Sequence, residues 1–453
     1  MQKIRYFLAI IIGKCVSLGL KIIGKKVPYY PGYIALRICP SFLDCVHKPK
    51  LTVAVTGTNG KSTISALLID VFKKLNYRVI NNNGFNVKDG VAAMFLKDIS
   101  LFHKRAEVVV LEIDEKSSGN IFKSLKPDYL ICTNLFRDSM RTNSNYEYIA
   151  SKINQGIPDE TTVIMPADDL ITSSYIKPKK TVYYSINKYD SSSDKVYNLV
   201  CDLVYCPECG SKLIYDYVNY HHIGKVHCSK CKFTNPKAKY IADIDLKNKI
   251  MTVNKVKYVI SNTSIFNLYN ELAVISLLNE IKIEEDKKCE VISSLQITDS
   301  RFSIEKIGNI SLINQMSKGQ NPVATSSAFN YIRHCHGDKT IILILDDVED
   351  KKYSCETVGW YYDTDFEFLN DKHIKHILIG GVRSLDVYNR LLYAGVPKEK
   401  LEYSIEQFEL YKKLTISDID TIVILHDIHE YDHSLIIKKQ IKEVIQNENR
   451  NTI

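Results

Sequence analysis

Residues 56–63 read TGTNGKST, a short glycine-rich loop whose composition suits the binding of nucleotide phosphates. Two glycines allow a tight backbone turn that brings N–H groups to phosphate oxygens, a lysine can reach the β- and γ-phosphates, and the serine after it can ligate Mg²⁺. Apolar runs at 51–55 and 64–72 place the loop between a strand and a helix, whose N-terminus adds its dipole. We predict a site for ATP and Mg²⁺ formed by Gly57, Thr58, Asn59, Gly60, Lys61, Ser62 and Thr63.

Four cysteines are spaced as two CxxC pairs, the arrangement of a zinc site. They are Cys206, Cys209, Cys228 and Cys231. Two such turns offer four thiolates in a tetrahedron, so we expect Zn²⁺ in a closed site with a structural role. His222 and His227 lie in the same stretch and are alternative ligands. The other cysteines are scattered, which is typical of buried thiols in a reducing compartment and not of a secreted disulfide scaffold.

Two apolar runs downstream of the loop end in polar residues. The run at 108–112 ends in Glu112, and the run at 129–134 ends in Asn134. Both runs are predicted to be buried strands of a parallel sheet, and α/β enzymes gather their ligands at the C-terminal ends of such strands. This edge is therefore the predicted place for catalytic and binding groups.

A second set of apolar runs follows residue 300. Three predicted strands alternate with two predicted helices, which indicates a further α/β domain with a largely parallel sheet. The strands are expected at 339–345, 376–381 and 420–425, and the helices at 384–394 and 436–444.

Composition indicates an ordinary globular protein of two or three domains, because its 453 residues are 45% hydrophobic and 25% charged. The net charge of +8 is spread along the chain, and no basic–aromatic stripe flanks the cysteine pairs, so we expect no nucleic-acid partner. Residues 1–26 are basic and apolar, but no run approaches the roughly 20 residues that span a bilayer. This segment is expected either to pack on its own protein or to lie on a membrane surface. The expected location is the cytoplasm, including the inner face of the membrane.

The loop form GxxGKST, with Val55 where the common phosphate-binding loop has glycine, resembles the Mur ligase family, which joins amino acids to peptidoglycan precursors. The resemblance implies that Glu112 helps to hold Mg²⁺. It also implies that Asn267 and Asn270, which form an NxxN pair on a predicted helix, lie on the adenine side. Lys152 is in a place comparable to a carbamylated lysine of many Mur ligases.

The segments WYYDTDFE at 360–367, GGVR at 380–383 and TNLFRD at 133–138, together with the four-cysteine insertion, resemble the MurT family. That family provides the ligase-like subunit of lipid II isoglutaminyl synthase. The resemblance implies a Mur ligase-type central P-loop domain with an inserted Cys₄ zinc ribbon, followed by a C-terminal α/β domain with a mostly parallel sheet. We expect an N-terminal helical segment at 1–48, an ATP-binding domain at 49–299 with the ribbon at about 201–236, and the MurT-type domain at 300–453.

The resemblance also implies a reaction and a partner. ATP would phosphorylate the α-carboxylate of D-glutamate in the lipid II stem peptide, and ammonia would convert the acyl phosphate to D-isoglutamine. The ammonia would come from a GatD-type class I glutaminase in a heterodimer, because Cys355 is a lone candidate nucleophile in this chain without a glutaminase signature. The resemblance implies that Asp363 completes the glutaminase's Cys–His pair, with Asp365 as the fallback.

Two other functions remain open at this stage. A Mur-type or folylpolyglutamate-type ligase would add an amino acid and would hydrolyse ATP without a partner. A zinc-ribbon binding protein would use ATP only as a structural or regulatory ligand, and Lys61→Ala would leave its function intact.

Overall fold

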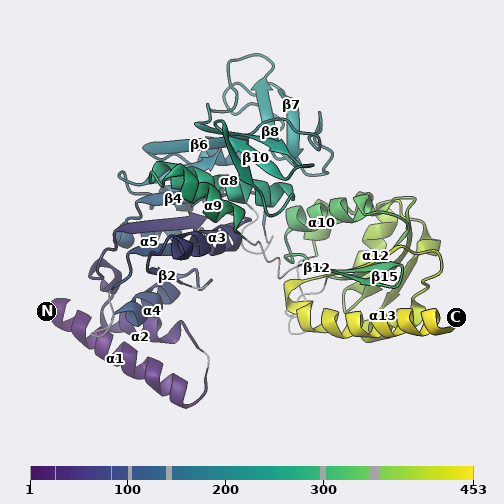
Figure 1. The fold of residues 1–453 in the computed structure, drawn as a ribbon, viewed down its shortest axis with the longest axis horizontal. Coiled ribbons are helices and arrows are strands. Elements are labelled where there is room, and N and C mark those ends of the chain that lie inside the picture. The colour runs from purple at the N-terminus through teal and green to yellow at the C-terminus, as the bar shows by residue number, and fades with distance from the viewer. Residues whose placement is uncertain are drawn as a thin grey trace. The chain divides into compact units, whose positions relative to one another are not determined.

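The computed structural model describes residues 2–25, 27–82, 84–99, 105–138, 145–295, 302–345 and 358–451, and divides the chain into two compact units (Figure 1). The first unit comprises Met1–Phe136, Asn145–Val196 and Cys201–Ile297, and the second comprises Arg137–Ser144, Tyr197–Val200 and Thr298–Ile453. Two short segments within the first half of the chain therefore belong to the second unit. The predicted domain boundaries stay predictions, and the one at 299/300 lies outside the described residues.

Among the described residues, nine strands of the first unit form one sheet in the order β11-β10-β9-β6-β5-β4-β1-β3-β2. Neighbours from β2 to β9 pair in parallel, whereas β9, β10 and β11 are antiparallel. The central strands are almost wholly buried, as expected for a parallel sheet covered on both faces. The strands are β1 (Leu51–Thr56), β2 (Val79–Asn81), β3 (Val108–Glu112), β4 (Tyr129–Cys132), β5 (Thr162–Pro166), β6 (Lys180–Ile186), β9 (Tyr240–Asp245), β10 (Ile250–Val253) and β11 (Val256–Val259).

Helices complete the first unit, and the predicted strand, loop and helix around the glycine-rich segment are confirmed by β1 and α3. The helix that carries the predicted NxxN pair, α8, is buried along most of its length. None of the described helices is long and apolar enough to span a bilayer. The helices are α1 (Gln2–Ile22), α2 (Tyr30–Ile38), α3 (Lys61–Lys74), α4 (Lys88–Asp98), α5 (Ser118–Leu125), α6 (Tyr146–Asn154), α7 (Leu170–Tyr175), α8 (Ile265–Glu280) and α9 (Glu285–Ser293), with a short 3₁₀ turn η1 (Phe42–Asp44).

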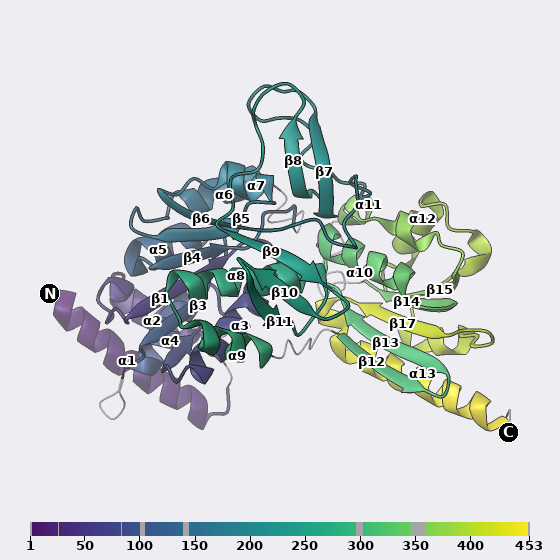
Figure 2. The ribbon, with the colours of Figure 1, turned by 45° about the horizontal axis from the view of Figure 1, so that its top comes forward.

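A two-stranded antiparallel hairpin, formed by β7 (Leu213–Tyr220) and β8 (Ile223–Cys228), is inserted between β6 and β9. Figure 2 shows it projecting from the nine-stranded sheet. The four cysteines lie at the end of the hairpin opposite its turn: two precede β7, Cys228 is the last residue of β8, and Cys231 follows it. The predicted insertion is therefore a separate small element of the first unit.

The second unit is a six-stranded sheet in the order β12-β13-β17-β14-β15-β16 among its described residues, parallel except for the β12/β13 pair. One face of the sheet packs with Phe329 of α10 and Leu391 of α12, and the other packs with Ile437 and Ile441 of α13. Helices thus cover both faces of a mostly parallel sheet, which confirms the predicted α/β class. The strands are β12 (Phe302–Ile307), β13 (Ile310–Met316), β14 (Lys339–Ile344), β15 (Ile374–Gly380), β16 (Leu401–Ser404) and β17 (Thr421–His426). The helices are α10 (Pro322–His334), α11 (Trp360–Asp363), α12 (Ser384–Tyr393) and α13 (Tyr431–Asn451), with 3₁₀ turns at η3 (Phe366–Leu369), η4 (Lys398–Lys400), η5 (Gln407–Lys413) and η6 (Ile428–Glu430).

Candidate nucleotide site and metal centre

The loop between β1 and α3 requires glycine at two positions. Gly57 and Gly60 have φ angles of 120° and 88°, in the region that side chains rarely adopt. A Cβ atom on Gly57 would lie 2.3 Å from Oγ1 of Thr133, and one on Gly60 would lie 2.5 Å from Oδ1 of Asn270. The loop is therefore backed closely by the end of β4 and by α8.

Asn134, two residues after the end of β4, hydrogen-bonds to the loop and holds it in place. Its Oδ1 accepts a hydrogen bond from the backbone N–H of Asn59 at 3.0 Å, and its Nδ2 donates to the carbonyl of Asn59 at 3.1 Å. Its own carbonyl accepts from the N–H of Thr58 at 2.9 Å. The strand-end position of Asn134 was predicted, but its bracing role depends on a contact across the sheet that the sequence does not display.

Lys61, the first residue of α3 directly after the loop, is half of a nearly buried ion pair. Its Nζ is 2.6 Å from Oε1 of Glu115, and the two side chains are 12% and 4% exposed. The same ammonium donates to the carbonyls of Gly57 and Thr58. Burial raises the pKa of Glu115 above its ordinary value, and the neighbouring Lys61 opposes that rise. Sequence reasoning missed Glu115, although its place three residues after the end of β3 was a signal.

Ser62 and Glu112 form the oxygen-rich part of the site. Oγ of Ser62 donates to Oε1 of Glu112 at 2.9 Å. Asn82 holds the end of β3 in place through two hydrogen bonds to the backbone of Glu112. Oδ1 of Asn82 accepts from the N–H of Glu112 at 2.9 Å, and Nδ2 of Asn82 donates to the carbonyl of Glu112 at 2.6 Å. A hydroxyl and a carboxylate beside a phosphate loop are the ligand types that Mg²⁺ prefers, so the donor set fits that ion.

The NxxN pair on α8 adjoins the loop. Asn267 and Asn270 are both buried, and Nδ2 of Asn270 lies 3.4 Å from Oδ1 of Asn267. Asn270 is also the side chain that a Cβ on Gly60 would meet. Thr63 follows in the first turn of α3 and is partly exposed. The structure thus brings the loop, Glu112 and the NxxN pair together, while their roles in binding stay predictions.

Glu271 is a second buried carboxylate on α8, next to Asn270. Its side chain accepts a hydrogen bond from Oγ of Ser261 at 2.8 Å. Burial raises the pKa of Glu271 to about 7, and the bond from Ser261 only partly opposes that rise. A group that changes protonation near neutral pH therefore sits beside the candidate adenine side.

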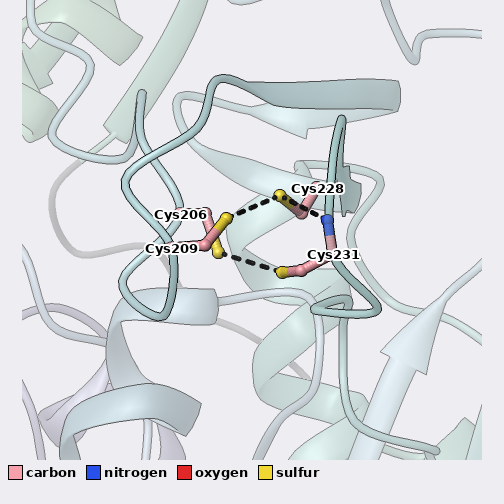
Figure 3. A group of neighbouring side chains, drawn as sticks. All are labelled: Cys206, Cys209, Cys228 and Cys231. Atoms are coloured by element: carbon pink, nitrogen blue, oxygen red, sulfur yellow. Dashed lines mark hydrogen bonds between the residues drawn. The ribbon is translucent and has the colours of Figure 1, made fainter.

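The four predicted metal ligands converge (Figure 3). Their sulfur atoms lie within 4.8 Å of one another, with separations of 3.6 Å between Cys206 and Cys231 and 3.5 Å between Cys209 and Cys228. Four thiolates at about 2.3 Å from a zinc ion would stand about 3.8 Å apart, whereas a disulfide needs about 2.05 Å. The arrangement fits a tetrahedral Cys₄ metal site.

The two histidines weighed as alternative ligands have other partners. Nε2 of His222 lies 3.3 Å from Oδ1 of Asp169, and both side chains are buried. Burial alone would raise the pKa of Asp169, but interactions with His222 and Thr172 lower it below its ordinary value. Nδ1 of His227 lies 3.0 Å from Oδ1 of Asp216. The four cysteines therefore carry the predicted site among the described residues.

In the second unit, the two candidate aspartates occupy different environments. Asp363 ends α11, is 21% exposed, and has its Oδ2 3.5 Å from Nη1 of Arg137. Asp365 is buried, and it accepts hydrogen bonds from the N–H of Leu199 at 2.6 Å and from Nδ2 of Asn198 at 2.7 Å. Asp365 thus holds the 197–200 segment, while Asp363 is the more accessible carboxylate.

A further charged cluster follows β13 in the same unit. Nζ of Lys318 lies 2.5 Å from Oδ2 of Asp138, and Nδ2 of Asn321 donates to Oδ1 of Asp138 at 3.1 Å. A Cβ on Gly319 would lie 1.5 Å from Oδ2 of Asp427, so a larger residue there would displace this carboxylate. The sequence stretch at 319–322 is therefore a packed turn at the C-terminal ends of β13 and β17, and the role of Asp138 was missed because its partners are distant in sequence.

Two weaker candidates remain. Lys152 is on α6, and its Nζ lies 5.2 Å from the ring centroid of Tyr148. The carbamylation of Lys152 stays a prediction. Cys355 lies outside the described residues.

Two protein families match most of this chain. The Mur ligase middle domain matches residues 55–278, and the MurT ligase C-terminal domain matches residues 319–429. A relative from Staphylococcus aureus (strain COL), named lipid II isoglutaminyl synthase (glutamine-hydrolyzing) subunit MurT, is 28% identical over 398 residues, which are 86% of this chain and 89% of that protein. The subunit of the same name from Streptococcus pneumoniae (strain ATCC BAA-255 / R6) is 25% identical over 404 residues, covering 87% and 88%.

Solved structures show the same fold. A pseudomurein peptide ligase type C from Methanothermus fervidus aligns with a TM-score of 0.66 at 20% identity, covering 90% of this chain and 81% of that one. MurF from Acinetobacter baumannii aligns with a TM-score of 0.62 at 14% identity, covering 90% and 80%. The predicted resemblance is therefore confirmed: the chain matches both the Mur ligase middle domain and the MurT ligase C-terminal domain, and over most of its length it is similar to MurT subunits.

Proposed function

We propose that this chain is the ATP-using subunit of an amidating ligase that converts the D-glutamate α-carboxylate of the lipid II stem peptide to D-isoglutamine. The observation that carries the proposal is the joint match of a Mur ligase middle domain and a MurT C-terminal domain in one chain. The full-length relatives are named as MurT subunits of a glutamine-hydrolyzing lipid II isoglutaminyl synthase. The proposed location is the cytoplasm, where ATP is available.

In the first step, a carboxylate oxygen of the substrate attacks the γ-phosphorus of ATP, giving an acyl phosphate and ADP. Catalysis of such a transfer consists mainly of positioning and charge neutralisation. Lys61 would leave Glu115 and turn its ammonium to the phosphates, and Ser62 and Glu112 would hold Mg²⁺ beside them. Asn267 and Asn270 would take the adenine side.

In the second step, ammonia attacks the acyl carbon, the bond to the phosphate oxygen breaks, and the products are the primary amide and inorganic phosphate. Free ammonia is scarce at neutral pH, so a partner must supply it. We propose a GatD-type class I glutaminase, whose Cys–His pair would be completed by Asp363. Asp363 is partly exposed, which supports that assignment, whereas Asp365 is buried and bonded to Asn198 and Leu199 inside the second unit.

The four-cysteine site would hold Zn²⁺ without taking part in the chemistry. All four ligand positions would be filled by thiolates, which leaves none for water or substrate. Its proposed role is to stabilise the inserted hairpin.

A reconstituted reaction tests the proposal. The chain is incubated alone and with a GatD-type glutaminase, with lipid II, ATP and Mg²⁺, and with either glutamine or ammonium. Mass spectrometry should show an ATP-dependent conversion of the acid to the amide, from glutamine only when the glutaminase is present. If neither nitrogen source gives the amide, the proposal is wrong. ATP hydrolysis that depends on an amino acid and needs no partner would instead identify an amino-acid-adding ligase.

A further inference from the structure

We infer that helix α1 docks on an anionic lipid surface through its exposed apolar face. The helix lies along the outside of α2 and α4 in the first unit (Figure 1). Its outward side carries large apolar side chains that the fold leaves uncovered. The inference goes beyond the proposed reaction, because it concerns where the chain resides and not what it catalyses.

The exposed apolar residues form one stripe. Their spacing of three, four or seven residues places them on the same side of a helix with 3.6 residues per turn. They are all at least 59% exposed. The stripe consists of Ile4, Phe7, Ile11, Leu18 and Ile22.

The opposite side of α1 is fixed against the protein by small residues. Ala9 and Gly13 are buried. A Cβ on Gly13 would lie 2.8 Å from a methyl carbon of Leu96 and 3.4 Å from the carbonyl of Pro31, so the helix approaches α4 and α2 as closely as glycine allows. This contact sets which face points outward, so the exposure of the stripe is a property of the packed helix.

The charges around the stripe identify its partner. Lys3 and Lys21 follow one flank of the stripe, and Arg5 lies on the other side. Lys14 is on the same flank as the two lysines, where its ammonium donates to the carbonyl of Ile99. No aspartate or glutamate precedes Asp44. An apolar face bordered by cations is the pattern of a helix that lies in the interface of an anionic bilayer, with the basic side chains reaching the headgroups. A second copy of this chain would bring the same cations together without acidic partners, which disfavours self-association through this face.

The test is co-sedimentation of the full chain with vesicles, without ATP or substrate, so its outcome does not depend on the proposed reaction. Vesicles of phosphatidylcholine with phosphatidylglycerol are compared with vesicles of phosphatidylcholine alone. We expect binding to the anionic vesicles, weaker binding to the neutral ones, and a decline in binding with added salt.

Variants separate the two parts of the surface. Replacing Phe7, Ile11 and Leu18 together with glutamine should weaken binding to anionic vesicles at least about tenfold. The charge reversals Lys3→Glu and Lys21→Glu should do the same. Since all five side chains are exposed, both variants should fold normally, which melting curves would verify.

A matched control removes apolar surface elsewhere. Val259, Ile304 and Ile405 are 54–64% exposed, and glutamine at these three positions should leave vesicle binding unchanged. Equal losses in the control and in the α1 variant would contradict the inference. So would an absence of vesicle binding by the unaltered chain, or a concentration-dependent dimer that the α1 variant abolishes.

Discussion

Without a bound phosphate, the positive charge of Lys61 beside the glycine-rich loop is neutralised by the carboxylate of Glu115. The ammonium is 2.6 Å from the carboxylate, and both groups are largely withdrawn from water. A buried charge without its partner is costly, so each group needs either the other or a ligand. Phosphates would compete with Glu115 for Lys61, so Glu115 would be part of the candidate nucleotide site.

The pair predicts separate effects on stability and on turnover. Lys61→Ala should lower ATP-dependent turnover about a hundredfold or more, because a charge aimed at the phosphates is lost. It should also destabilise the first unit by about 3 kcal/mol, because Glu115 is left buried and unpaired. Adding Glu115→Gln should recover most of the stability and none of the activity. Calorimetry and an ATPase assay measure the two quantities, and a double variant as unstable as Lys61→Ala would contradict the role given to Glu115.

Glu271 predicts a pH dependence of stability. Its pKa is raised from 4.5 in the unfolded chain to about 7 in the folded one, so between these values the folded state holds more protons. Protonated Glu271 therefore contributes fully to the free energy of unfolding below about pH 4.5, and this contribution is lost as the pH rises through about 7. Glu271→Gln should remove this loss. At pH 8 the variant should be more stable by roughly 2–3 kcal/mol, and at pH 4 the difference should vanish.

Calorimetric melting of the chain and of Glu271→Gln across this pH range measures the difference. The control is Glu284→Gln, which alters an exposed carboxylate whose Oε2 lies 2.7 Å from Nζ of Lys287. A constant difference between Glu271→Gln and the unaltered chain at all pH values would show that Glu271 does not titrate in this window.

At the scale of elements, local sequence patterns predicted most of the strands and helices that form the candidate sites. Three features could be predicted because each depends on residues that are close in sequence. They are the loop with its flanking strand and helix, the strand that ends in Glu112, and the four cysteines. Asn82, Glu115 and Asn134 were not assigned roles, because each acts through contacts between strands that only the sheet order creates. Nor does the sequence indicate that residues 137–138 and 197–200 belong to the second unit, because polar linkers carry no periodic pattern.

The hairpin insertion predicts one bound metal ion per chain. Cys209→Ser should abolish zinc binding and lower the melting temperature of the insertion, because three thiolates cannot complete the tetrahedron. Elemental analysis of the purified chain measures the stoichiometry. The matched control is Cys201→Ser, which removes a thiol of the same insertion outside the cluster and should retain the ion. Equal zinc content in the two variants would contradict the assignment.

At the scale of the whole molecule, the chain carries the candidate nucleotide site in one unit and a partly exposed carboxylate, Asp363, in the other. Phosphoryl transfer and the release of ammonia are separate reactions, so damage to one need not affect the other. If Asp363 completes the partner's catalytic pair, its loss should stop ammonia production and leave carboxylate activation untouched. A residue that merely supports the fold would affect both.

Asp363→Asn should therefore lower glutamine-driven amidation by the heterodimer about a hundredfold or more, comparable to losing the orienting carboxylate of a triad. Amidation driven by added ammonium should stay within about twofold, and it should rise with pH, because each pH unit below the ammonium pKa increases the free base about tenfold. Asp386→Asn, at an exposed acid of the same unit, should change neither reaction. Asp365→Asn should lower both, because it releases the 197–200 segment. If Asp363→Asn lowers both activities equally, Asp363 acts on the fold of the second unit, and the partner's catalytic carboxylate lies elsewhere.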